Sequence, residues 1–197
     1  LIPSHIYYDG QINLLNKCID SLINQSLKCD IYISISFEND SYKKEFKNIL
    51  EKYNEKVKFR ISKKQLFQME HLHKLFRENE EKYELFMFCD DDDTYHFQRV
   101  ELLLHIFELE KKKNIDNFGG VREILKSDYE NPEYWAYCLK PEVLKVFFSR
   151  FHNSYNNYLK HRFGDMFLRY FLSKNLTYNN FFILINHLYI YILIQNG

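Results

Sequence analysis

Four consecutive aspartates, Asp90 to Asp93, are the residues whose type and spacing most clearly suggest chemistry. They end a continuous apolar run, YELFMFC at residues 83–89. Adjacent like charges repel one another, and folding alone does not require such a cluster. Mg²⁺ and Mn²⁺ prefer oxygen ligands and often take only one or two protein carboxylates, with phosphates and water completing the shell. We therefore expect this run to contact a divalent cation.

The sequence leaves the register of that contact open. Alternate residues at a strand end point the same way, so either Asp91 with Asp93 or Asp90 with Asp92 can converge on one ion. A solvated acidic turn, in which an aspartate caps the following helix, is the alternative without a ligand.

The elements around the run place it at the edge of a sheet. Apolar periodicity predicts strands at 1–6, 29–37, 56–62 and 83–89, and helices at 12–27, 41–53, 63–79 and 97–113. This alternation predicts an α/β fold with a mostly parallel, doubly wound sheet. Ligands bind such sheets at the carboxyl ends of the strands. The polar segments PSH, END, SKK and the aspartate run each follow a predicted strand.

The regular alternation of strands and helices does not continue in the second half of the chain. We expect a turn and strand within 117–127, a strand at 133–140, helices at 141–151 and 164–175, and a buried apolar segment at 181–194. We interpret residues 1–197 as one domain, in which 114–197 form a smaller lobe at the edge of the sheet built by 1–113.

Composition excludes some classes of function. Lysine plus arginine number 27 and aspartate plus glutamate also number 27, which argues against nucleic-acid binding. The four cysteines lack metal-ligand spacing and indicate a reducing, cytoplasmic compartment. The segment 181–194 is shorter than the about 20 residues that span a bilayer, so we expect no membrane span. The start at Leu1 suggests one domain of a longer protein, and the abundance of Phe, Tyr, Asn, Lys and Ile suggests a viral or other AT-rich genome.

Two other sites compete for the run. A calcium-binding EF-hand loop starting at Asp90 would have Glu101 at its twelfth position, but Tyr95 stands where glycine is needed. The segment from Asp90 to Thr94 also resembles the D-x-D-x-T motif of haloacid-dehalogenase-like phosphohydrolases, which would make Asp90 the nucleophile and Asp92 a general acid beside Mg²⁺. That motif normally lies on the first strand of its fold, whereas here it follows the fourth.

Five segments together resemble the GT-A glycosyltransferase fold, in its family 2-like branch. These are IPSH, YISISFENDS, ELFMFCDDDDTYHFQRVE, WAYCLKPEVL and FGDMFLRYFL, in that order along nearly the whole chain. The resemblance implies a metal-dependent, hexosyltransferase-like enzyme that moves a sugar from a nucleoside-diphosphate sugar, with UDP favoured, to a hydroxyl of a glycan, glycoprotein or other acceptor. It implies Mn²⁺ or Mg²⁺ as cofactor and inversion at the anomeric carbon. A nucleotide-sugar-binding module without turnover remains a further alternative.

The resemblance also implies roles for individual residues. Residues 1–113 would bind the donor and 114–197 the acceptor. We expect the donor to contact Pro3, Ser4, His5, Glu38, Asp40, Lys63, Lys64, Gln68, Asp91 and Asp92. We expect the metal to contact Asp93 directly, with Asp91 and His187 assisting and Asp92 still possible.

On the acceptor side, Asp165 is the expected general base, although a helix-capping role would also explain it. Trp135 and Tyr137 are expected to alternate on a strand and stack on sugar rings, with core packing as the alternative.

Overall fold

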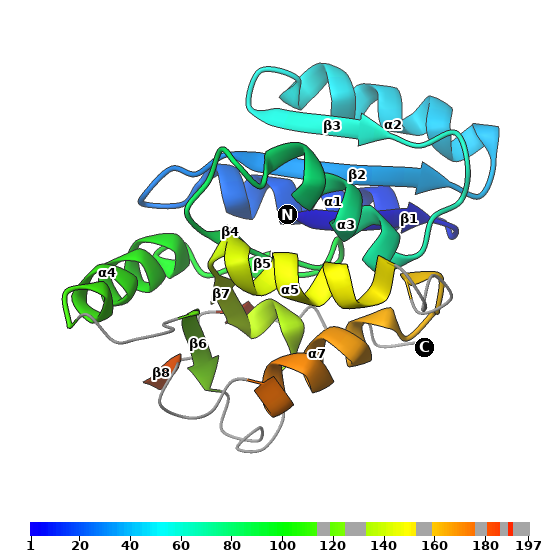
Figure 1. The fold of residues 1–197 in the computed structure, drawn as a ribbon. Coiled ribbons are helices and arrows are strands. Elements are labelled where there is room, and N and C mark those ends of the chain that lie inside the picture. Colours follow the sequence, from blue (N-terminus) through cyan, green and yellow to red (C-terminus); the bar gives the residue numbers. More distant parts are fainter. Residues whose placement is uncertain (114–118, 125–132, 153–158, 176–180, 186–188, 191–197) are drawn as a thin grey trace.

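The computed structural model describes residues 1–113, 119–124, 133–152, 159–175, 181–185 and 189–190. Three parallel strands form its amino-terminal sheet: β1 (Ile2–Ile6), β2 (Ile31–Phe37) and β3 (Val57–Ile61). The connecting helices are α1 (Gln11–Ile23), α2 (Asp40–Tyr53) and α3 (Gln68–Asn79). Figure 1 shows α1 and α2 on one face of this sheet and α3 on the other. This arrangement confirms the predicted α/β fold.

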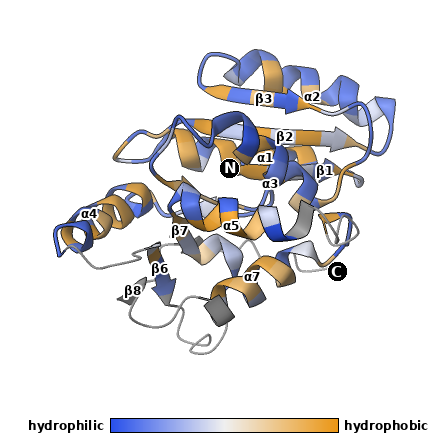
Figure 2. Ribbon diagram, viewed as in Figure 1, coloured by the Kyte–Doolittle hydropathy of each residue, from blue (hydrophilic) through white to orange (hydrophobic). Residues whose placement is uncertain are grey.

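Apolar spacing explains why these segments become helices. In α1, Ile12, Leu15, Ile19 and Leu22 recur at intervals of three or four residues, and all four are buried. Helix α2 begins after Asn39, whose side chain accepts hydrogen bonds from the backbone N–H groups of Ser41 and Tyr42. Figure 2 shows hydrophilic residues over most of the visible surface of α2, as expected for an outer helix.

A fourth strand, β4 (Phe86–Met87), lies on the other side of β1. The amino group of Leu1 donates to Met87 O at 2.6 Å, and Cys89 N–H donates to Leu1 O at 3.3 Å. Strand β4 pairs antiparallel with β7 (Tyr137–Leu139), which pairs antiparallel with β6 (Gly120–Ile124). Strand β6 in turn pairs in parallel with β8 (Phe181–Ile185).

The three-stranded sheet has the order β1-β2-β3 and the four-stranded sheet the order β4-β7-β6-β8, and the contacts of Leu1 place β4 beside β1. The chain builds outward from β1 to β3 and then returns to place β4 beside β1. Such a reversal is a topological switch point, and ligands bind outside the carboxyl ends of the strands there. The fold thus predicts a site between the ends of β1 and β4.

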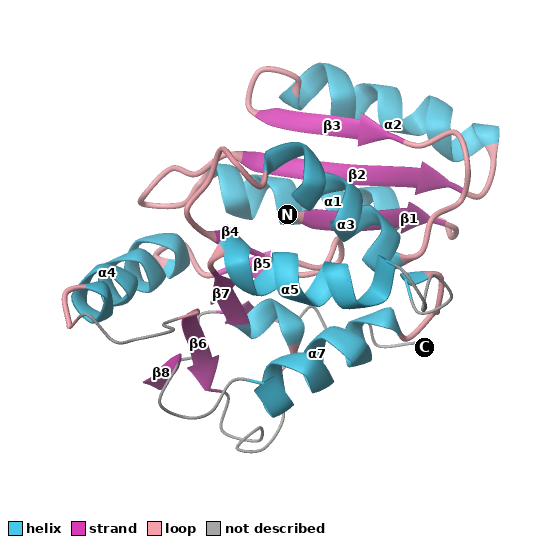
Figure 3. Cartoon of the chain, in the orientation of Figure 1, coloured by secondary structure: helices cyan, strands magenta, loops and turns pink. Residues whose placement is uncertain are grey.

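Several predicted element boundaries were wrong. Helix α3 begins at Gln68 rather than at residue 63, because the Glu70 carboxylate accepts a hydrogen bond from Phe67 N–H and sets the first turn there. Figure 3 shows the preceding residues as the loop between β3 and α3. The predicted strand at 133–140 is a 3₁₀ helix, η1 (Tyr134–Ala136), followed by β7. Its residues 134–139 are all buried, so they carry no periodicity that distinguishes the two.

The remaining elements complete the fold. Helices α4 (Arg99–Lys111), α5 (Pro141–His152) and α7 (Gly164–Asn175) are all found near their predicted positions. Strand β5 (Thr94–Tyr95), just after the aspartate run, pairs with β9 (Tyr189–Ile190). Strands β8 and β9 both lie within the apolar segment predicted at 181–194. No helix in the described part of the chain is both long and apolar enough to cross a membrane.

A buried ion pair joins the two halves. Arg99, the first residue of α4, donates through Nε to Glu123 of β6, and neither side chain is exposed to solvent. Arg99 Nη2 also donates to Trp135 O at 2.7 Å, and the guanidinium lies 3.9 Å from the ring centroid of Tyr95. The start of α4 is therefore fixed against β6 and η1.

Candidate functional site

The aspartate run lies at the switch point between β1 and β4. Ser4 Oγ, on β1, donates to Asp91 Oδ2 at 2.5 Å. Gln11 Nε2, at the start of α1, donates to the same oxygen at 3.0 Å. Both donors are buried, so Asp91 is held in one orientation. The predicted proximity of Ser4 and Asp91 is confirmed.

Asp90 is held from the opposite side. Gln68 Nε2, at the start of α3, donates to Asp90 Oδ1 at 3.0 Å, and the hydroxyl of Tyr134 donates to the same oxygen. Gln68 also donates to the Tyr134 hydroxyl oxygen at 3.1 Å. Asp90 therefore links β4 to α3 and η1.

The last two aspartates differ in exposure. Asp93 is buried, with 7 % of its surface exposed, and its backbone N–H donates to Asp90 O at 3.3 Å to close the turn. Asp92 is only partly buried. Burial, followed by the charges of Asp92 and Asp91, raises the pKa of Tyr8, so this tyrosine lies close to the run. Asp92 thus offers the more accessible carboxylate of the two.

The charged forms of two carboxyl groups in the run are disfavoured. Burial is the main cause that raises the pKa of Asp90 to about 8 and that of Asp91 to about 7, and the charge of Asp92 raises both pKa values further. The hydrogen bonds from Tyr134 and Ser4 act in the opposite direction. A divalent cation would relieve this repulsion, because its charge is opposite and its preferred ligands are oxygens.

The described residues alone do not supply a complete ligand set for a metal ion. Among the described residues, no three or more His, Cys, Asp or Glu side chains group together so that they could hold a metal ion. A hard cation with one or two carboxylate ligands ordinarily completes its shell with substrate phosphates and water. The donor set here fits that mode of binding.

A second polar network adjoins the first at the ends of β1 and β2. His5 Nδ1 lies 2.8 Å from Ser36 Oγ, and His5 Nε2 lies 3.2 Å from Glu38 Oε2. His71, on α3, hydrogen-bonds Ser36 through Nε2 at 3.0 Å and Ser34 through Nδ1 at 2.7 Å. The structure therefore brings two predicted donor-binding residues, His5 and Glu38, together beside the switch point.

His71 is the buried histidine of this network. Burial lowers the pKa of His71 to about 3, so its ring is neutral and carries one N–H. The Ser36 oxygen also accepts from Leu66 N–H at 3.4 Å. The neutral ring of His71 therefore donates to one of Ser34 and Ser36 and accepts from the other.

Four further predicted donor-binding residues lie on β1, on α2 and in the loop before α3. Pro3 is buried within β1. Asp40 is exposed in the first turn of α2, and Lys63 and Lys64 are exposed in the loop before α3. Their proposed roles remain predictions.

The predicted acceptor-stacking role of Trp135 and Tyr137 is wrong. Each has 2 % of its surface exposed and belongs to the main hydrophobic core. Trp135 lies in η1 and Tyr137 in β7, so they do not alternate along one strand. Core packing, the alternative reading of these aromatics, explains both residues.

Asp165 is the second residue of α7 and is partly buried. Its charge contributes, after burial and Asp90, to raising the pKa of Tyr134. Since Tyr134 also contacts Asp90, the structure brings the predicted base toward the aspartate run. His187, the predicted additional metal contact, lies outside the described residues.

Two residues of the site were not predicted from the sequence. Gln11 is a polar residue on the buried face of α1, which was a detectable signal. Tyr134 lies among apolar and aromatic neighbours, so only its contacts reveal its role.

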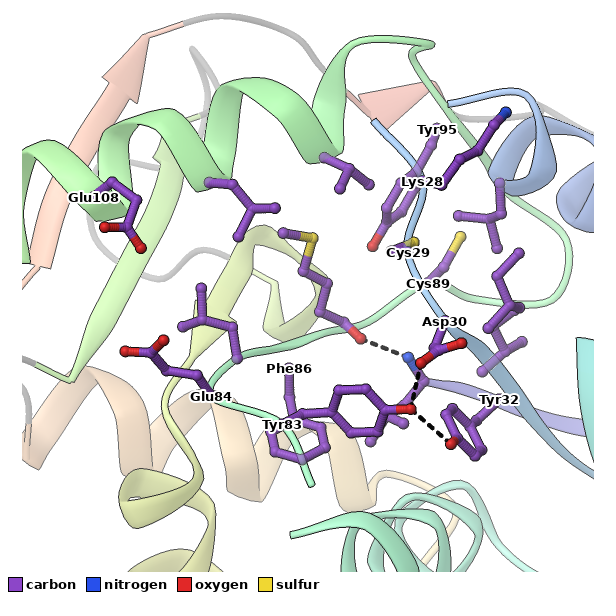
Figure 4. Close-up of a pocket in the computed structure, with 18 residues that line it drawn as sticks. Lys28, Cys29, Asp30, Tyr32, Tyr83, Glu84, Phe86, Cys89, Tyr95 and Glu108 are labelled. Atoms are coloured by element: carbon purple, nitrogen blue, oxygen red, sulfur yellow. Dashed lines mark hydrogen bonds between the residues drawn. The ribbon is translucent and has the colours of Figure 1, made fainter. Parts of the chain in front are cut away.

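A cavity of about 400 Å³ lies at the other ends of the strands. Its lining includes Leu1, Ile31 and Phe86, which lie at the amino ends of β1, β2 and β4. Figure 4 shows Asp30, Tyr32 and Tyr83 hydrogen-bonded at one side, with Cys29 and Cys89 nearby. None of the four aspartates of the run lines this cavity, so we place the functional site at the carboxyl ends instead.

Comparison with known proteins bears on the family to which the chain belongs. The family model described as glycosyl transferase family 2 matches residues 2–184. A search among curated proteins found no match.

Solved structures share the fold at low identity. The crystal structure of Staphylococcus aureus TarS matches with a TM-score of 0.59 and 10% identity, covering 98% of this chain and 37% of TarS. TarS residues 1–349 in complex with UDP-GlcNAc match with a TM-score of 0.55 and 12% identity, over 100% of this chain and 58% of that one. The 4-diphosphocytidyl-2C-methyl-D-erythritol synthase from Anaerococcus prevotii matches with a TM-score of 0.54 and 13% identity, covering 99% and 91%. The chain thus spans between 37% and 58% of the length of these two TarS chains.

Proposed function

Because the chain belongs to glycosyl transferase family 2, we propose that it transfers a sugar from a UDP-sugar to a hydroxyl group of a glycan or glycoprotein acceptor. The observation that carries this proposal is the anchoring of the aspartate run at the switch point. Ser4 and Gln11 hold Asp91, while Gln68 and Tyr134 hold Asp90. This leaves Asp92 as the accessible carboxylate at the position where nucleotides bind such sheets.

The choice of UDP rests on the structural neighbours. TarS 1–349 has been crystallised with UDP and with UDP-GlcNAc, and both complexes share this fold. We place the nucleoside near His5 and Glu38, and the diphosphate near Asp91 and Asp92. Residues 1–113 would then bind the donor and residues 114–197 the acceptor.

We assign the metal contact to Asp92 in preference to Asp93, the residue favoured by the sequence. Asp93 is buried, whereas Asp92 is partly exposed beside Tyr8. A bound Mn²⁺ or Mg²⁺ would supply the charge that stabilises the leaving diphosphate. Asp91 keeps its two hydrogen bonds and orients the turn around that contact.

Asp165 is the proposed general base. It would accept the proton of the acceptor hydroxyl as that oxygen attacks the anomeric carbon from the side opposite the diphosphate, so the anomeric centre inverts. A base acts at about 3 Å from the proton donor or through one water. The partly buried position of Asp165 near Tyr134 suits this role.

A phosphohydrolase is less well supported. That reaction would use Asp90 as a nucleophile, but its Oδ1 already accepts two hydrogen bonds from Gln68 and Tyr134. Family membership also favours sugar transfer.

Turnover of a panel of nucleotide sugars with Mn²⁺ tests the proposal. We expect slow hydrolysis of a UDP-sugar, faster with an acceptor, that is abolished by Asp92→Asn and retained by Glu51→Gln, a matched carboxylate change on the exposed side of α2. If Asp93→Asn abolishes hydrolysis of the UDP-sugar and Asp92→Asn retains full activity, the metal contact would be assigned to Asp93 instead. Phosphatase activity lost in Asp90→Asn, without sugar release, would contradict the proposed function.

A further inference from the structure

Tyr134 connects the aspartate run to the acceptor side of the molecule. Its side chain is buried, with 2 % exposed. Its hydroxyl donates its only proton to Asp90 Oδ1 and accepts a hydrogen bond from Gln68 Nε2 at 3.1 Å. A buried hydroxyl that loses its partners costs about 1–3 kcal/mol, so these contacts restrict where Tyr134 can lie.

Two arginines hold the short helix η1 that carries Tyr134. Arg169 Nη1, on α7, lies 2.8 Å from Oε1 of Glu133, the residue just before η1. Arg99 Nη2, on α4, donates to Trp135 O at 2.7 Å. Residue 165 lies one helical turn before Arg169, so the contact that fixes η1 also fixes the end of α7 with Asp165.

Asp90 in turn controls the turn that presents Asp92. Its carbonyl oxygen accepts hydrogen bonds from Asp93 N–H at 3.3 Å and from Cys18 Sγ at 3.5 Å. Its side-chain Oδ1 accepts from Gln68 and Tyr134. A change in the orientation of Asp90 would therefore move the turn between Asp90 and Asp93.

We propose that Tyr134 is a positioning residue, which together with Gln68 orients Asp90 and couples the helix of Asp165 to the turn that presents Asp92. This inference rests on the proposed function. Tyr134 does not touch the reacting atoms in this scheme. It acts through Asp90, as outer hydrogen-bond partners do around metal sites, where their loss typically lowers metal affinity or activity by about 10–100-fold.

The test compares Tyr134→Phe with Tyr53→Phe. Tyr53 is also buried, and its hydroxyl lies 2.7 Å from the side-chain oxygens of both Asp20 and Asn16, but it lies on α2 away from the site. Both variants lose a tyrosine–aspartate hydrogen bond of the same kind. We expect Tyr134→Phe to raise the Mn²⁺ concentration for half-maximal activity about tenfold and to lower kcat at saturating Mn²⁺. Tyr53→Phe should lose stability without either change.

Gln68→Leu supplies an independent measurement. Since Gln68 and Tyr134 donate to the same oxygen of Asp90, their effects on the Mn²⁺ requirement should be non-additive in the double variant. Additive effects would contradict a shared action through Asp90.

The outcomes separate this inference from the proposed function. If the wild type turns over no nucleotide sugar, the proposed function fails, and Mn²⁺-dependent UDP binding measured by calorimetry still compares the two tyrosine variants. The inference is overturned if Tyr134→Phe matches Tyr53→Phe in Mn²⁺ requirement, kcat and UDP affinity. It is also overturned if the wild type shows no Mn²⁺-dependent UDP binding.

Discussion

Arg99 and Glu123 form an ion pair whose two side chains have no exposed surface. Removing one partner of such a pair leaves a buried charge without compensation, at a cost of about 3–5 kcal/mol. We expect Arg99→Met to lower the free energy of unfolding by this amount in urea titrations. Arg60→Met is the control, since Arg60 pairs with Glu78 at the surface, and exposed pairs contribute at most about 1 kcal/mol. Equal losses of unfolding free energy in the two variants would show that breaking the buried pair costs no more than breaking a surface pair.

His71 predicts a defined loss of stability in acid. Its pKa is about 3 in the folded protein, against 6.5 for the unfolded chain, because burial disfavours the charged ring. Between these values the unfolded state binds a proton that the folded state does not, so stability falls as pH decreases below 6.5, by up to about 1.4 kcal/mol per pH unit. His71→Asn should show a shallower decrease between pH 6.5 and 5 in urea unfolding, whereas His105→Asn, an exposed change on α4, should follow the wild type. Identical slopes in wild type and His71→Asn would refute this assignment.

The two donors to Asp91 should support nucleotide binding. Ser4→Ala and Gln11→Leu each remove one hydrogen bond to Oδ2, so Asp91 loses its fixed orientation. Hydrogen bonds to charged groups contribute about 1.5–3 kcal/mol, and we expect the Kd for UDP with Mn²⁺ to rise at least about tenfold in the double variant. Calorimetry measures this directly. An unchanged Kd would mean that Asp91 is held for the fold alone.

Asp165→Asn separates catalysis from binding. The amide keeps the size of the side chain and can still cap α7, but it cannot accept a proton. We expect kcat to fall about 10²–10⁴-fold, the usual contribution of a general base, while the Kd for UDP stays unchanged. A variant that retains full turnover would leave Asp165 only the role of an acidic residue in the first turn of α7.

The sequence predicted the strands β1 to β3 and most helices because their apolar residues recur with clear periods. It also predicted that Ser4, His5, Glu38 and Asp91 gather at one sheet edge, since parallel strands end there together. The register within the run could not be predicted, because four identical side chains carry no pattern. Only their individual hydrogen bonds and burial distinguish Asp92 from its neighbours.

Tyr134 and Trp135 show why the acceptor side was less predictable. Both are aromatic residues in one buried segment, and sequence reasoning assigned a ligand contact to Trp135 and none to Tyr134. In the structure Tyr134 reaches Asp90, whereas Trp135 is buried in the core and accepts a hydrogen bond from Arg99 through its backbone carbonyl. Such contacts depend on tertiary packing between elements more than 30 residues apart in the chain.

The central place of β1 also has a consequence for synthesis on the ribosome. Strand β1 precedes the other described strands in the chain, yet it lies between β2 and β4 and is hydrogen-bonded to Met87 through Leu1. One edge of β1 therefore remains unpaired until β4 has been synthesised, and β4 in turn pairs with β7. At translation rates of about 5–20 residues per second, this edge stays unpaired for several seconds in the nascent chain. Unpaired strand edges promote aggregation, so the nascent chain is most vulnerable before β4 and β7 emerge.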